Sequence, residues 1–240
     1  GKTTTLYSTL NRLEKPDVNI VTVEDPIEYD LANINQAQVN IKSGVTFSSA
    51  LRSILRQDPD IIMVGEVRDE ETVELAIRAS LTGHLVFSTI HTNDAASGFT
   101  RLLNWNIEPF LITSTVKGVL AQRLVRRLCK ECREPYSPTS QELLMAGLSD
   151  YMDLKAYKST GCLNCRNTGY KGRIGIYELL LMDNDIAELI LQGVPAYKMR
   201  EQARKNGMKT LLEDGVTKIE RGDTSISEIY ETLGATQIVS

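Results

Sequence analysis

The sequence predicts an α/β protein with a mostly parallel sheet, because short apolar segments alternate with helical segments in the first half of the chain. Two of the apolar segments are continuous runs, which is typical of strands covered on both faces. We therefore expect buried strands there. The expected strands are residues 19–23, 61–64 and 85–90, and the expected helices are residues 4–13, 46–56 and 70–81.

Four of these six elements are followed closely by a proline or glycine, which break regular structure. Proline follows the first helix at Pro16, the first strand at Pro26 and the second helix at Pro59, and Gly83 follows the third helix. Ligands of parallel α/β sheets bind beyond the carboxyl ends of the strands. The polar residues after each strand are therefore the first candidates for a functional site.

The second half of the chain has a different character. Cysteine, glycine and proline become dense after Arg127, and the residues from 177 onwards are expected to form short helices. We predict a core at 1–127, a cysteine-bearing module at 128–175 and a helical region at 176–240. The expected helices are residues 140–145, 185–191, 196–205, 210–221 and 227–233.

The composition is that of a soluble globular protein, with 42% hydrophobic and 24% charged residues among 240. A net charge of −4 disfavours a dedicated nucleic-acid-binding protein, which usually carries a basic excess. The apolar runs are too short to span a bilayer, and no signal peptide is visible. These features exclude a transmembrane segment and lead us to expect a cytoplasmic protein.

All 4 cysteines fall into two C-x-x-C pairs, Cys129 with Cys132 and Cys162 with Cys165. Two such pairs are the usual ligand spacing of a structural, tetrahedral Zn²⁺ site, in which four thiolates fill the coordination shell. Four reduced structural thiols or a pair of disulfides are the alternatives, and a cytosolic location disfavours the disulfides. The spacing predicts a structural zinc site.

The chain opens on Gly1-Lys2-Thr3-Thr4, which matches the second half of a phosphate-binding loop. In such a loop the lysine reaches the β- and γ-phosphates, and the following hydroxyl ligates Mg²⁺. The helix that starts here would point its N–H groups at the phosphates. The alternative is an ordinary helix start with Thr3, Thr4 or Thr5 as its cap.

Carboxylates and a histidine follow the predicted strands. Glu66 comes after strand 61–64, Glu24 and Glu28 follow the preceding strand, and His91 follows strand 85–90. ATP hydrolysis needs a carboxylate to orient water and polar groups around the phosphates. Each of the glutamates could instead be a solvated strand-end residue.

Arg52 and Arg56 lie four residues apart on one helix face, where they could reach a phosphate together. A surface face of ion pairs is the more ordinary reading of such a pair. The second histidine, His84, precedes strand 85–90 and is expected to be structural, because a strand separates it from His91.

Together these segments resemble the secretion ATPases of the type II secretion and type IV pilus assembly family, most closely the type II secretion members. The matching stretches are the phosphate-loop remnant, the family's Asp box, its Walker B stretch, its His box and the tetracysteine module. They lie at residues 1–3, 23–29, 58–69, 82–93 and 129–165. The resemblance implies a RecA-like P-loop NTPase core that works as a homo-hexameric ring with ATP, Mg²⁺ and Zn²⁺.

The resemblance also implies a role for each candidate residue. Glu66 takes the place of the Walker B glutamate, and Glu24 or Glu28 that of the base that activates water. Thr3 would ligate Mg²⁺, and His91 would contact the γ-phosphate side. The other groups implied around the nucleotide are Gly1, Lys2, Thr4, Arg52 and Arg56.

By this resemblance the chain is an ATP-hydrolysing motor that powers pseudopilus assembly and protein secretion through the bacterial type II secretion system. Type IV pilus extension is the alternative, followed by a nucleic-acid translocase and a ring component that does not hydrolyse ATP. The family docks on inner-membrane secretion or pilus platform proteins through N-terminal domains that this sequence lacks. We expect a location peripheral to that membrane, no direct contact with nucleic acid, and little ATPase activity from residues 1–240 alone.

Overall fold

The computed structural model describes residues 1–234, which form two compact units. The first unit comprises Gly1–Val119 and Leu180–Ala203, and the second comprises 120–179 with the described residues from 204 onwards. The chain passes from one unit to the other three times, so neither is one continuous segment. The division at 127 and 175 that the sequence suggested stays a prediction.

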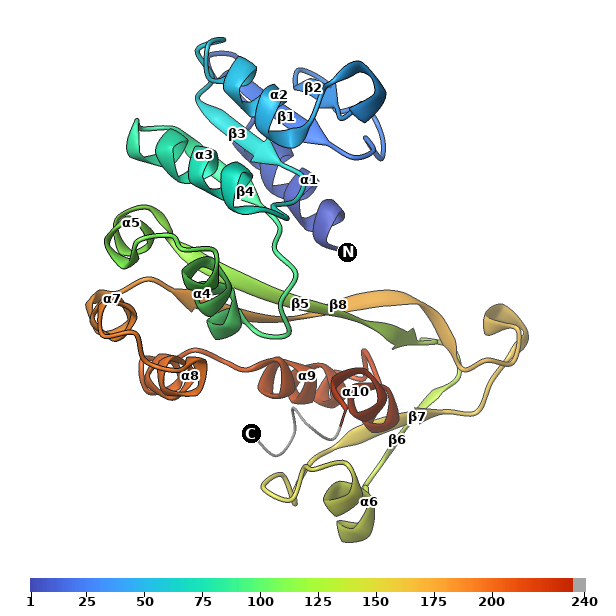
Figure 1. Ribbon diagram of the computed structural model, residues 1–240. Coiled ribbons are helices and arrows are strands. Elements are labelled where there is room, and N and C mark those ends of the chain that lie inside the picture. The colour runs from blue at the N-terminus through green and yellow to red at the C-terminus, as the bar shows by residue number, and fades with distance from the viewer. Residues whose placement is uncertain (235–240) are drawn as a thin grey trace. The chain divides into compact units, whose positions relative to one another are not determined.

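The first unit is built on a parallel four-stranded sheet with the order β2-β1-β3-β4 (Figure 1). Val23 of β1 pairs with Val64 of β3, which pairs with Ser88 of β4, so the three strands end at the same edge. The strands are β1 (Ile20–Glu24), β2 (Asn35–Gln38), β3 (Ile61–Val64) and β4 (Leu85–Ser88).

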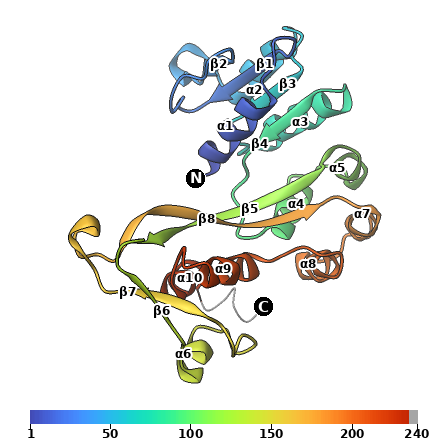
Figure 2. The same cartoon turned by 180° about the vertical axis from the view of Figure 1, so that it is seen from behind.

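Helices cover both faces of this sheet, α1 on one and α2 on the other (Figures 1 and 2). Buried Tyr7 and Leu10 of α1 pack against Ile20, Ile61 and Met63 of the sheet. The helices of this unit are α1 (Lys2–Leu13), η1 (Ile41–Ser43), α2 (Phe47–Ile54), α3 (Glu70–Leu81), α4 (Ala95–Asn104), α5 (Pro109–Thr115), α7 (Asn184–Leu191) and most of α8 (Ala196–Lys205). The α/β fold class is confirmed.

Local chemistry explains where the confirmed elements begin. Thr46 caps α2 through a reciprocal capping box with Ser49, and the Asp69 carboxylate caps α3 by accepting from the Thr72 N–H. After α3, Gly83 takes a φ of +100°, a left-handed conformation that favours glycine. Such signals are local in sequence, so these boundaries were predictable.

The strands differ from what the sequence led us to expect in three places. Strand β2, with the polar sequence NQAQ, was not foreseen, because it lacks the apolar pattern of a strand. Strand β4 is not buried: it lies at the edge of the described sheet, and Leu85 is 43% exposed. Residues 177–181 are not helical but continue β8, where exposed Tyr177 and Leu179 alternate with buried residues.

The second unit combines two small sheets with helices. Glu228 of α10 is buried and accepts from the backbone N–H and the guanidinium of Arg126, both at 2.7 Å, which ties α10 to β5. Strand β5 pairs with β8, and β6 pairs antiparallel with β7. The elements are most of β5 (Gly118–Leu128), β6 (Arg133–Tyr136), α6 (Ser140–Met145), β7 (Ala156–Ser159), η2 (Leu163–Cys165), most of β8 (Tyr170–Leu181), α9 (Leu211–Glu220) and α10 (Ile226–Leu233).

The helices expected in the second half of the chain are all present within one or two residues, including α6 inside the cysteine-bearing segment. Across residues 1–234, no helix combines the length and the apolar character that a membrane crossing requires.

Candidate nucleotide and metal sites

Helix α1 begins at Lys2, with Gly1 as its N-cap and no side chain making a cap hydrogen bond. Thr3, Thr4 and Thr5 lie inside the helix, so the alternative of a threonine-capped helix start does not hold. The Thr5 hydroxyl instead donates back to the Gly1 carbonyl at 3.2 Å. A helix start without a side-chain cap can direct its N–H groups and the positive end of its dipole at an anion.

Glu24 ends β1 and is buried, at 2% exposure. Its carboxylate accepts from the Tyr7 hydroxyl, from the Thr22 hydroxyl at 2.6 Å and from the Gln36 amide at 3.0 Å. Glu28, by contrast, is exposed, and its backbone N–H donates to the Tyr7 oxygen at 3.3 Å. The structure therefore distinguishes the two glutamates that the sequence left as alternatives.

The Tyr7 hydroxyl is held in its protonated form. Burial raises its pKa, and the adjacent Glu24 carboxylate raises it further, to about 12. At neutral pH this side chain is therefore a stable hydrogen-bond donor to Glu24.

Glu66 follows β3 and is largely shielded, with a side-chain exposure of 15%. One carboxylate oxygen, Oε1, forms an ion pair with Arg68. The other, Oε2, lies 3.3 Å from Nε2 of His91 and forms a second ion pair when that imidazole is protonated. Burial raises the pKa of Glu66, but the hydrogen bonds and charges of Arg68 and His91 outweigh this effect and hold it below its ordinary value. Glu66 is therefore an ionised carboxylate at neutral pH.

Hydrogen bonds join the ends of the three strands that carry these residues. The Gly65 N–H donates to the Val23 carbonyl at 2.8 Å, and the Thr89 hydroxyl donates to the Gly65 carbonyl at 2.8 Å. Glu24, Glu66 and His91 thus share one edge of the sheet. In both Figure 1 and Figure 2 the start of α1 lies on the side of the sheet where the chain leaves β4.

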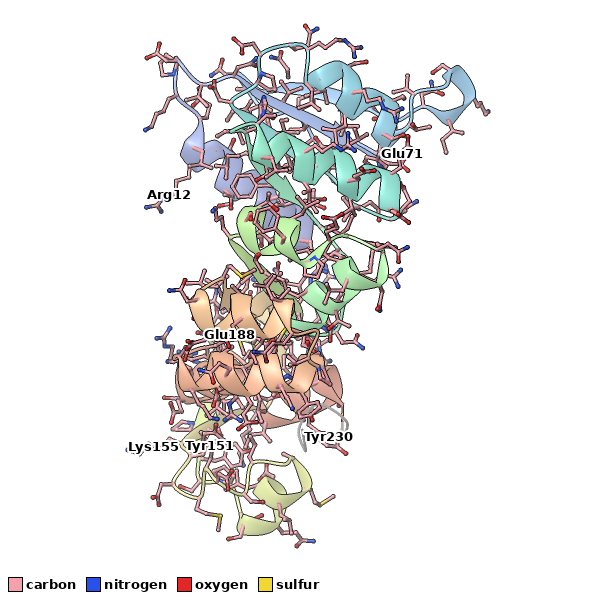
Figure 3. The ribbon with its side chains drawn as sticks, turned by 60° about the vertical axis from the view of Figure 1, so that its left-hand side comes forward. Arg12, Glu71, Tyr151, Lys155, Glu188 and Tyr230 are labelled. Atoms are coloured by element: carbon pink, nitrogen blue, oxygen red, sulfur yellow. The ribbon has the colours of Figure 1, made fainter. Side chains whose placement is uncertain are left out.

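The two arginines have partners of their own in the structure. Arg52 pairs with Glu71 of α3 at 2.6 Å, where both side chains are about half exposed, and Figure 3 labels Glu71 on this surface. The Arg56 guanidinium donates to the Arg52 carbonyl at 2.8 Å. This arrangement is a surface ion pair between α2 and α3, and a phosphate contact for either arginine stays a prediction.

His84 has the structural surroundings that the sequence led us to expect. Its Nδ1 lies 2.9 Å from the Ala79 carbonyl and 3.0 Å from the Thr82 hydroxyl, at the end of α3. It lies before β4, whereas His91 follows that strand.

We expect Arg68→Ala to raise the pKa of Glu66, because it removes the hydrogen bond and positive charge that lower it. A carboxyl group with a depressed pKa stabilises the fold above its unfolded pKa of about 4.3, and this contribution is lost as the pH falls through its lower folded value. Without Arg68 this contribution is smaller, and its loss is complete at a higher pH. Carboxyl ¹³C titration by NMR measures the shift, and Arg78→Ala, which breaks the exposed pair with Glu74, is the control.

The four cysteines converge on one point. Their Sγ atoms all lie within 4.8 Å of one another, and Cys129–Cys162, Cys132–Cys165 and Cys162–Cys165 are each 3.8 Å apart. These separations are far longer than an S–S bond of about 2.05 Å, so the disulfide alternative does not hold. A tetrahedral Zn²⁺ with Zn–S bonds of about 2.3 Å requires sulfur atoms about 3.8 Å apart, which this cluster matches.

The backbone supports the cluster. The N–H groups of Cys162 and Gly169 donate to the Cys165 sulfur at 3.2 and 3.3 Å. Burial raises the pKa of Cys165, but these two donors outweigh it and lower the pKa to about 6. Burial and the neighbouring thiols raise the pKa of Cys132 to about 12. A bound divalent cation would allow all four to be thiolates together.

Several residues at the sheet edge were missed from the sequence. Thr22 had a usable signal, because it lies two residues before Glu24 and therefore on the same face of β1. Arg68 likewise lies only two residues after its partner Glu66. Tyr7 and Gln36 had no signal that a single sequence reveals, since each reaches Glu24 through the fold.

The chain matches a family model described as "Type II/IV secretion system protein" over residues 1–231. It is 51% identical over 229 residues to the type II secretion system protein HxcR of Pseudomonas aeruginosa and 48% identical over 229 residues to the type II secretion system ATPase E of Vibrio cholerae. Each alignment covers 95% of this chain and 45% of the relative.

A pilus protein is about equally similar. The type IV pilus assembly ATPase PilB of Thermus thermophilus is 50% identical over 231 residues, which cover 95% of this chain and 26% of that protein. The chain therefore spans less than half the length of these curated relatives.

Among solved structures, the pilus retraction motor PilT with bound ADP superposes with a TM-score of 0.71 at 28% identity, over 98% of this chain and 58% of that one. The ATPase DotB of Legionella pneumophila shares the fold, with a TM-score of 0.68 at 24% identity. Since the family match extends over nearly all of the described residues, this chain belongs to the type II/IV secretion system protein family.

Proposed function

We propose that the chain is the RecA-like, P-loop part of an ATP-hydrolysing motor that powers pseudopilus assembly and protein secretion through a type II secretion system. The observation that carries this proposal is the convergence of Glu24, Glu66 and His91 on the edge where three parallel strands end. Ligands of parallel sheets bind at such an edge. The start of α1 on the same side supplies the anion-binding end of a helix.

The surroundings of each candidate residue indicate the role that we propose for it. The phosphates would be bound by Lys2, by the first N–H groups of α1, and by Gly1 and Thr4. Thr3 would hold Mg²⁺. When bound, this ion neutralises negative charge on the phosphates during phosphoryl transfer. Glu24, whose carboxylate is fixed by three donors, is our choice over Glu28 for the base that orients water.

Glu66 would act from the Walker B position as an ionised carboxylate, and His91 beside it would sense the γ-phosphate side. Arg52 and Arg56 would need to leave their present partners on the α2–α3 surface to reach a phosphate.

Type IV pilus extension is the second candidate function, since PilB of Thermus thermophilus is as similar as the secretion proteins. The cysteine cluster would hold a structural Zn²⁺ in either case. We further infer a homo-hexameric ring that docks on inner-membrane secretion or pilus platform proteins, and hence a cytoplasmic location peripheral to that membrane.

We expect Lys2→Ala in the complete protein to raise the KM for ATP and reduce hydrolysis by about 10²–10³-fold, because a phosphate-loop lysine stabilises charge on the phosphates. Steady-state phosphate release measures this, with Lys15→Ala beyond the end of α1 as the control. Turnover that survives the loss of Lys2 would refute the nucleotide site. Complementation of secretion-deficient and pilus-deficient strains then separates the two candidate functions.

A further inference from the structure

Tyr7 is a fully buried side chain, 0% exposed, to which the proposed reaction gives no role. It lies in α1, the helix that starts with Lys2 and Thr3. Its hydroxyl contacts the Glu24 carboxylate and the Glu28 backbone N–H. One oxygen atom thus joins the helix of the candidate phosphate site to Glu24, which ends β1, and to Glu28, which follows it.

The direction of each hydrogen bond is fixed by chemistry. A phenol has one proton to donate and two lone pairs that accept. The Glu28 N–H and the Gln36 amide, at 3.3 and 3.5 Å, are both donors, so they occupy the lone pairs. The single proton must therefore go to Glu24, and the hydroxyl has no freedom to rotate away.

Both oxygens of the Glu24 carboxylate are held. Oε1 accepts from Thr22 and Gln36, and Oε2 accepts from Tyr7. A carboxylate offers about four acceptor positions. Within residues 1–234 these three donors leave one acceptor position of the carboxylate open. That position is on Oε2, the oxygen that accepts the hydrogen bond from Tyr7.

We propose that Tyr7 is a positioning residue that fixes the Glu24 carboxylate relative to the start of α1, so that the remaining acceptor position of Oε2 receives the proton of the attacking water. The inference rests on the proposed ATPase function and deepens it. Catalysis by an oriented base depends on geometry at the scale of about 1 Å. A tether from the phosphate-site helix to the base would set that geometry.

The competing explanation is that Tyr7 is a core side chain whose hydroxyl is merely satisfied. Tyr7→Phe separates the two, because it keeps the buried ring and removes the hydroxyl. In the complete protein we expect kcat for ATP hydrolysis to fall about 10- to 100-fold, with the KM within about twofold of the wild type.

A second variant protects the test from a folding defect. Thr22→Val keeps the β-branched shape on β1 and removes the donor to Oε1, so it should also lower kcat without changing the KM. Tyr197→Phe, at a 62% exposed position of α8, is the matched control and should leave kcat and the KM unchanged. Near-UV circular dichroism at the assay temperature verifies that each variant is folded.

The outcomes are distinct. A reduced kcat with an unchanged KM, in both Tyr7→Phe and Thr22→Val, supports the proposal. A lower melting temperature with wild-type kcat and KM overturns it and leaves the ATPase function standing. If the wild-type complete protein shows no Lys2-dependent hydrolysis, the proposed function itself has failed.

Discussion

We expect Glu66→Gln to reduce ATP hydrolysis by the complete protein about 10²–10⁴-fold while ATP binding persists. Glutamine keeps the size of the side chain but cannot carry the negative charge that Arg68 and His91 now stabilise. The site would therefore keep its shape and lose its chemistry. Single-turnover hydrolysis with a separate measurement of nucleotide affinity distinguishes the two effects.

Glu74→Gln is the matched control for this experiment. Glu74 lies on the exposed side of α3 in an i,i+4 pair with Arg78. The Glu74→Gln variant therefore loses the same negative charge as Glu66→Gln but leaves the residues of the sheet edge unchanged. It should hydrolyse ATP at the wild-type rate. Secretion by cells that carry Glu66→Gln reports on the motor, and normal secretion there would favour a ring component that does not hydrolyse ATP.

Metal removal should have the second large effect. A structural Zn²⁺ contributes about 10–16 kcal/mol of apparent binding free energy to the fold that holds it. Without the ion, nothing holds together the four sulfur atoms, which all lie within 4.8 Å of one another. We expect residues 129–175 to lose protection from hydrogen exchange after chelation, and β1 and β3 to keep theirs.

Reconstitution provides the control. Adding Zn²⁺ should restore protection in residues 129–175, whereas Mg²⁺ should not, because hard cations prefer oxygen ligands over thiolates. Cys132→Ser should reproduce the chelated state without a chelator. Uniform protection along the chain after the metal has gone would show that the cysteine cluster does not depend on it.

The candidate sites were predictable to the extent that their signals are local. Glu66 and His91 could be placed because strands that alternate with helices end at a common edge. The cysteine cluster was predictable from two short spacings. Strand β2 was not, because its polar residues resemble a loop, and it is held in the sheet by pairing with β1.

The sequence by itself determined the α/β class, the edge at which functional residues gather and the cysteine quartet, because each depends on periodicity or spacing within a few residues. Only the tertiary structure showed that Glu24, and not Glu28, has its carboxylate fixed by hydrogen bonds. It also showed that Arg52 pairs with Glu71. The physical reason is that a hydrogen bond such as that from Tyr7 to Glu24 joins residues 17 positions apart. Such a contact exists only after α1 has packed on the sheet.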